Sequence, residues 1–108
     1  MDLSAVPRDA RVLFLGTGVP AAEATLALVS RGHRGKIVAI SESGTLPSDL
    51  RPEVAASLHE IVAWHRLVLK AGRLLSQRSF RRGIRVEYFS HELGTPAKLE
   101  CDFVLPLE

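Results

Sequence analysis

The chain has 108 residues, of which 46% are apolar and 24% charged, and its formal net charge is +2. These values are typical of one compact globular domain, so we predict a single domain over residues 1–108. The small charge does not indicate nucleic-acid binding, and no apolar run approaches the roughly 18 residues of a membrane span. The only cysteine, Cys101, excludes an intramolecular disulfide. A lone thiol favours a reducing compartment, and we expect the cytoplasm.

The most informative stretch begins with four large apolar residues, Val12 to Leu15, which predict a strand buried on both faces. The six residues that follow form the pattern Gly-x-Gly-x-x-Ala: Gly16, Thr17, Gly18, Val19, Pro20 and Ala21. In this pattern the first glycine permits a tight turn and the second lets the backbone approach a phosphate. The final small residue lets the helix pack closely on the strand. The stretch therefore predicts a dinucleotide pyrophosphate at a helix N-terminus.

An acidic residue ends the second predicted strand. The helical pattern stops at Gly32, and Lys36 to Ser41 has the composition of a strand. Glu42 follows, 21 residues after Ala21, close to the ~20-residue spacing at which a carboxylate meets an adenosine ribose. The intervening helix is long enough to join parallel strands. Ser41 and Glu42 are therefore predicted to complete the cofactor site.

The remaining chain predicts fewer elements. Residues 43–52 have the composition of a loop, and residues 53–82 are predicted to be mostly helical, with Gly72 at a kink or break. Two further strands are predicted at 84–89 and 103–105. Because the connection between them is short and shows no helix, an antiparallel hairpin is the simpler interpretation. The expected fold is an α/β, three-layer Rossmann-like sheet of about four strands, the first of them parallel.

Other chemistry-bearing residues give weaker signals. His59 and His65 are six residues apart, about 240° around a helix, so they do not form a metal-binding pair. Cys101 has no base beside it and is expected to be a buried structural thiol. Seven basic residues and no acid lie between Arg66 and Arg85. They are interpreted as a solvated face, with an acidic partner domain or a phosphate-rich ligand as the functional alternatives. No catalytic residue is indicated.

The stretch from Arg11 to Ser41, with its segment Arg31-Gly32-His33-Arg34-Gly35, resembles the Rossmann unit of bacterial FAD/NAD(P)-binding flavoproteins. These are relatives of the pyridine nucleotide-disulfide oxidoreductases. The resemblance implies that Gly16, Gly18 and Ala21 form the phosphate turn and that Glu42 takes the ribose hydroxyls. NADP-using relatives tend to carry arginines after the second strand. An acid there would repel a 2′-phosphate, so the expected cofactor is NAD or FAD, and NADP is disfavoured.

A complete flavoprotein of this type also needs a second nucleotide domain and a substrate or interface domain, which 108 residues cannot hold. The chain is therefore interpreted as a fragment of a longer flavoprotein, a degenerate relative, or a domain whose partner is another chain, with a homo-oligomer left open. The first functional hypothesis is a dinucleotide-binding domain of an oxidoreductase-like protein, not catalytic alone. The second is a non-catalytic interaction or assembly module that uses the 53–82 helix.

Overall fold

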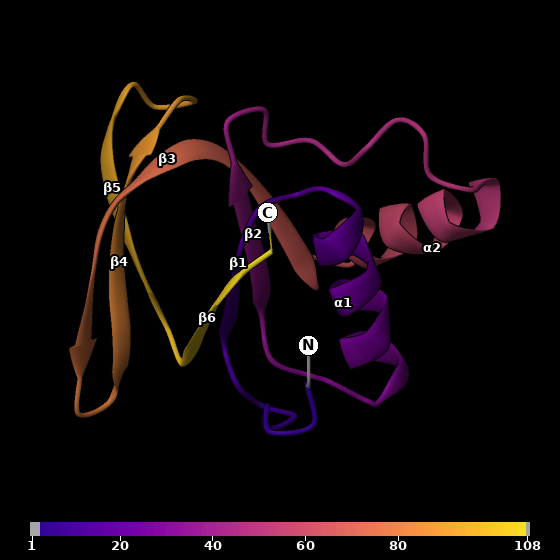
Figure 1. Ribbon diagram of the computed structural model, residues 1–108, viewed down its shortest axis with the longest axis horizontal. Helices are drawn as coiled ribbons and strands as arrows, with labels where there is room; N and C mark the ends of the chain where they lie inside the picture. The colour runs from indigo at the N-terminus through magenta and orange to yellow at the C-terminus, as the bar shows by residue number, and fades with distance from the viewer. Residues whose placement is uncertain (1–2, 108) are drawn as a thin grey trace.

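The computed structural model describes residues 3–107. The elements are β1 (Val12–Leu15), α1 (Val19–Ser30), β2 (Ile37–Ser41), α2 (Pro52–Ala63), β3 (Leu67–Phe80), β4 (Gly83–Ser90), β5 (Thr95–Cys101) and β6 (Phe103–Pro106). They form one six-stranded sheet in the order β5-β4-β3-β2-β1-β6. Figure 1 shows both helices on one side of β1 and β2, while β3 curves away to join β4 and β5 on the other side. Neither helix has the length and apolar character that a membrane span requires.

Four strands of the sheet are parallel. β1 lies between β2 and β6 and is parallel to both, and β2 is also parallel to the first part of β3. Strands of this kind are covered on both faces, which explains why Val12, Leu13 and Phe14 are all buried. The predicted α/β class and the parallel pairing of the first two strands are confirmed. The sheet has six strands rather than about four.

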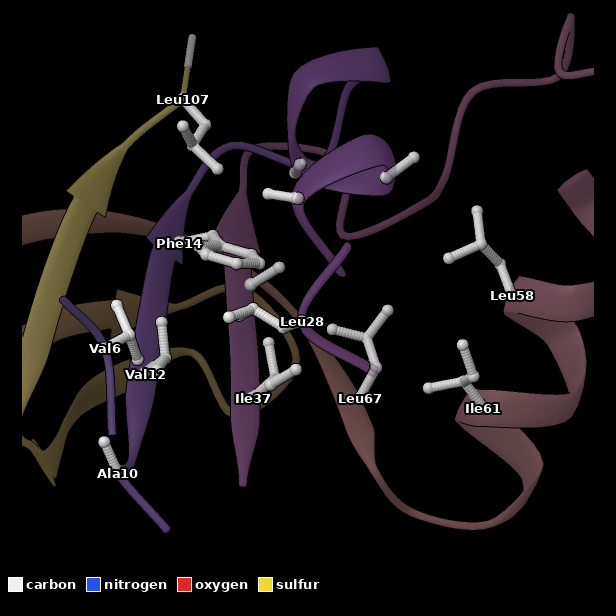
Figure 2. Close-up of a cluster of buried hydrophobic side chains, with 14 residues drawn as sticks. Val6, Ala10, Val12, Phe14, Leu28, Ile37, Leu58, Ile61, Leu67 and Leu107 are labelled. Carbon is white, nitrogen blue, oxygen red and sulfur yellow. The ribbon is translucent and has the colours of Figure 1, made fainter. Parts of the chain in front are cut away.

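Two hydrophobic clusters separate three layers. The first lies between the parallel strands and the helices, where Phe14 and Leu67 face Leu28 and Leu58 (Figure 2). The second lies on the opposite face, beneath the antiparallel strands, and contains Leu13, Ile40, Val86, Tyr88 and Cys101. The parallel strands are therefore the middle layer, and the predicted burial of the Cys101 thiol is confirmed.

The predicted helix over residues 53–82 is wrong beyond about its first third. Helix α2 ends at Ala63, and the chain turns through His65, whose φ of 59° lies in the left-handed region. The fourteen residues from Leu67 to Phe80 form β3. Its first part, from Leu67 to Ala71, pairs with β2 in parallel. The stabilisation from pairing with β2 therefore outweighs the helical propensity of these residues, which differs by only fractions of a kcal/mol per residue.

Gly72 marks the place where β3 changes its partner. Up to Ala71 the strand pairs with β2, and from Gly72 onward it pairs with β4 in antiparallel. A Cβ built on Gly72 would lie 2.5 Å from the carbonyl oxygen of Phe89. The glycine predicted as a helix break is therefore the point at which two strands approach too closely for any side chain.

The last predicted strand pair is also different from the expectation. β4 forms its hairpin with β5, whereas β6 runs parallel to β1. Strands β4 and β5 are themselves the connection from β3 to β6, so no helical crossover is needed.

Only Asp102 separates β5 from β6, and its carboxylate accepts hydrogen bonds from Arg11, at 2.8 Å from the backbone N and 3.0 Å from Nη2. These bonds hold the pKa of Asp102 below its ordinary value.

His33 is a buried histidine just after α1, and it gives stability a pH dependence. Its side chain has an Nε2 atom with no hydrogen-bond partner among residues 3–107. Burial lowers the pKa of His33 below its ordinary value of 6.5, and this is the largest contribution. A hydrogen bond with the Ala10 backbone opposes it, the charge of Arg66 lowers the pKa further, and Asp9 and Arg31 make smaller contributions in opposite directions. As the pH falls, the unfolded chain therefore binds more protons at this position than the folded protein does.

We expect the free energy of unfolding to decrease as the pH falls through about 6.5 toward the folded pKa of His33. Gln cannot titrate, so His33→Gln should flatten this dependence. Urea unfolding at several pH values between 7.5 and 5 measures the difference between the two proteins. Equal pH slopes in the wild type and the variant would show that His33 does not control it.

Candidate functional site

The glycine turn joins the end of β1 to the start of α1. Gly16 has a φ of 132°, which side-chain-bearing residues rarely adopt, and its N–H donates to the carbonyl oxygen of Ile40 at 2.8 Å. Gly18 is the N-cap residue of α1 and has an ordinary extended conformation. Among residues 3–107, a Cβ on Gly18 would meet only Pro20 Cδ, at 3.8 Å. No described part of the protein therefore packs into the space that a side chain at Gly18 would take, and this space is open.

The N-terminus of α1 carries no side-chain cap, and Pro20 stands in its first turn. The first N–H groups of a helix have no intrahelical partners and carry the positive end of the helix dipole. Ala21 is 2% exposed and belongs to the core, whereas Val19 is 43% exposed. Ala21 is thus buried, as close packing of a helix on a strand requires, and the helix end is suited to an anion.

Thr17 and Ser41 link the turn to the end of β2. Thr17 is buried, and its hydroxyl donates to the carbonyl oxygen of Thr45 at 2.6 Å. Because that proton is used, the Ser41 hydroxyl is the donor in the 2.7 Å bond between the two side chains. Ser41 Oγ also accepts the N–H of Gly44 at 3.0 Å. Both hydroxyls are therefore engaged by the protein itself and hold the turn against the loop after β2.

Glu42 follows β2 at the same edge of the sheet as the glycine turn. The parallel register pairs Leu15 with Ile40, so the two strands end side by side. The Glu42 side chain is 72% exposed, and its Oε2 lies 2.8 Å from Nε2 of His91. The structure thus brings the predicted turn and the predicted acid together, and it adds a histidine that the sequence did not indicate.

Four of the seven basic residues lie on strands, and the other three, Arg66, Arg81 and Arg82, lie in the connections between elements. Arg73 and Arg78 belong to β3, and Arg85 belongs to β4, directly opposite Arg78. Arg85 is bonded to Glu100 at 3.1 Å and lies 5.1 Å from the centre of the Phe80 ring. The predicted helix over residues 53–82 is therefore wrong for Arg73 and Arg78, whereas Arg85 lies in a strand as predicted. Among residues 3–107, no group of three or more His, Cys, Asp and Glu side chains gathers as a metal site would require.

Comparison with known proteins finds no matching family model and no match among curated proteins. Solved structures do match. A pyridine nucleotide-disulfide family oxidoreductase from Enterococcus faecalis V583 has a TM-score of 0.70 at 21% identity over 98% of this chain. The bacillithiol disulfide reductase of Bacillus cereus has a TM-score of 0.70 at 14% identity over 92%. The resemblance to these oxidoreductases is confirmed at the level of the fold.

The same fold occurs in the ornithine N-hydroxylase of Kutzneria sp. 744, whose structure holds reduced FAD, NADP+ and L-ornithine, with a TM-score of 0.71 at 17% identity over 93% of this chain. This chain spans 28% of the B. cereus enzyme, 24% of the E. faecalis enzyme and 35% of the hydroxylase. It therefore corresponds to one part of each of these larger proteins.

Proposed function

We propose that this chain is a dinucleotide-binding domain of an FAD/NAD(P)-linked oxidoreductase-like protein and that it binds NAD or FAD. One observation carries the proposal: the open Gly18 turn at the uncapped N-terminus of α1 lies beside Glu42, at the end of the adjacent parallel strand. Ligands of open α/β sheets bind at the carboxyl ends of the strands, which is where both features lie.

Each residue of the proposed site has a separate task. The N–H groups at the start of α1 bind the pyrophosphate, and the missing Cβ of Gly18 lets it approach the backbone. Glu42 accepts hydrogen bonds from the ribose hydroxyls. Thr17 and Ser41 hold the turn and the strand end together rather than contacting the ligand. NAD or FAD, when bound, supplies hydride-transfer chemistry, and this domain positions it.

The proposed site works within a larger assembly. The structural neighbours are about three to four times longer than the matched segment, so we assign the substrate site to a second domain or a partner chain. The lone thiol Cys101 supports a reducing compartment, the cytoplasm, as the location. The alternative of an assembly module that uses a 53–82 helix loses its basis, because α2 ends at Ala63.

A thermal-shift series with NAD, NADP, FAD and ADP at millimolar concentration tests the proposal. A ligand at 100 times its dissociation constant stabilises the folded state by about 2.7 kcal/mol. In a domain of this size, each kcal/mol of stabilisation raises Tm by about 4–8 °C, so the expected rise is well over 5 °C. We expect such shifts with NAD or FAD. A melting temperature that no nucleotide changes would refute the proposal.

Glu42 should also set the preference between NAD and NADP. A 2′-phosphate beside this carboxylate is repelled, so the wild type is expected to bind NAD more tightly. Glu42→Arg should raise NADP affinity relative to NAD by about tenfold or more, because a hydrogen bond to a charged group contributes roughly 1.5–3 kcal/mol. Calorimetric titration of both ligands measures the ratio. Glu60→Arg, which makes the same charge change on the exposed face of α2, should leave the ratio unchanged.

A further inference from the structure

His91 lies at the proposed ribose site without an assigned role. We propose that His91 is a positioning residue: it holds one oxygen of the Glu42 carboxylate so that the other can accept the 2′-hydroxyl of an adenosine ribose. This inference rests on the proposed function and adds a residue that determines how the ribose is recognised.

The contact leaves half of the carboxylate free. His91 Nε2 lies 2.8 Å from Oε2 of Glu42, and no hydrogen bond to Oε1 is found within residues 3–107. An ionised carboxylate offers about four acceptor positions on its two oxygens, so one imidazole does not saturate it. The Glu42 side chain is 72% exposed and would otherwise move among many rotamers. The bond to His91 removes part of that freedom before a ligand arrives.

His91 is itself held in place by contacts that do not involve Glu42. Its backbone N–H donates to the carbonyl oxygen of Ala71 at 3.0 Å, and Ala71 pairs with Ser41 in the β2–β3 register. Its ring makes an edge-type contact with the Phe89 ring, with the ring centres 5.9 Å apart and an interplanar angle of 61°. The side chain is 38% exposed, roughly half as much as that of Glu42. The histidine is therefore the fixed member of the pair, and the glutamate is the member that it orients.

The role does not depend on the protonation state of His91. The imidazole carries an N–H on Nε2 in its charged form and in one of its neutral tautomers, and either form donates to Oε2. The competing role for His91 is to block the Glu42 carboxylate. If His91 blocked Glu42 instead of orienting it, a ligand would have to displace it, and removing the imidazole would tighten binding.

The experiment couples the His91 side chain to a single ligand atom. Calorimetric dissociation constants are measured for ADP and 2′-deoxy-ADP with the wild type, His91→Leu and His91→Gln. Leu removes the donor, whereas Gln places an N–H near the position of Nε2. Both variants keep the backbone bond to Ala71, and thermal unfolding without ligand verifies the fold.

We expect His91→Leu to weaken ADP binding about 3- to 10-fold, the range that a single hydrogen bond supplies, and 2′-deoxy-ADP binding less than twofold. His91→Gln should recover most of the loss. Equal losses for the two ligands, tighter binding of ADP, or no recovery with Gln would overturn the positioning role while leaving nucleotide binding intact. A wild type that binds no ADP, NAD or FAD would instead refute the proposed function, and the role of His91 with it.

Discussion

Gly18→Ala is expected to weaken NAD or FAD binding by at least tenfold, or about 1.4 kcal/mol, and to leave the ligand-free protein nearly as stable as the wild type. Within the part of the chain that the structure describes, the added methyl group meets only Pro20 Cδ at 3.8 Å, an ordinary van der Waals distance. The φ of −80° and ψ of −164° at Gly18 are also accessible to alanine. In the proposed site, the methyl group would fill the space that the pyrophosphate needs in order to reach the backbone.

The neighbouring glycine provides the control for this prediction. Gly16 has a φ of 132°, so Gly16→Ala should cost about 1–3 kcal/mol of folding free energy even without a ligand. Chemical unfolding of the ligand-free proteins separates the two effects, and calorimetry with NAD and FAD measures the affinities. An alanine at position 18 that binds the dinucleotide as tightly as the wild type would remove the turn from the binding site.

Gly72→Ala is expected to lower the free energy of unfolding by about 2–3 kcal/mol. The new Cβ would lie 2.5 Å from Phe89 O, a backbone atom that moves only if the β3–β4 pairing opens at its start. Gly18→Ala makes the same chemical change where there is room, so it is the matched control for urea unfolding. Equal midpoints for the two variants would mean that the strands separate here without cost.

The first half of the fold could be predicted because its signals are local. An apolar strand, a glycine turn, a helix and a second strand follow one another within thirty residues, and each carries its own composition or periodicity. The parallel register then places Glu42 beside the turn without any further information. This part of the site is built from neighbours in the sequence, so the chain order nearly determines it.

The second half depends on contacts that no local pattern contains. β3 is rich in Leu, Arg, Lys and Ala, which favour helices, and it has one β-branched residue, Val68. Its strand conformation comes from β2 on one side and β4 on the other. In β5 the half-buried Ala97 and Leu99 and the buried Cys101 alternate with the exposed Lys98 and Glu100, but Pro96 concealed the pattern. Proline is acceptable there because β5 is an edge strand.

His91 shows the same limit at the site. It lies 49 residues from Glu42 and directly follows the antiparallel strand β4. The sequence around it is rich in turn residues and shows no relation to the proposed cofactor residues. Only the curl of β3 toward β4 brings it to the carboxyl end of β2. A search for residues at fixed spacing from the glycine turn could not have found it.

The pairing of β1 with β6 has a consequence for how the protein folds during synthesis. The contact between Arg11 and Asp102 joins residues that are 91 positions apart, so β1 remains without one neighbour until about ninety further residues have been made. At about 5–20 residues per second, that delay lasts roughly five to twenty seconds. During this time Val12, Leu13 and Phe14 expose one open strand edge. Chaperones that bind extended apolar segments therefore have a long interval in which to recognise β1.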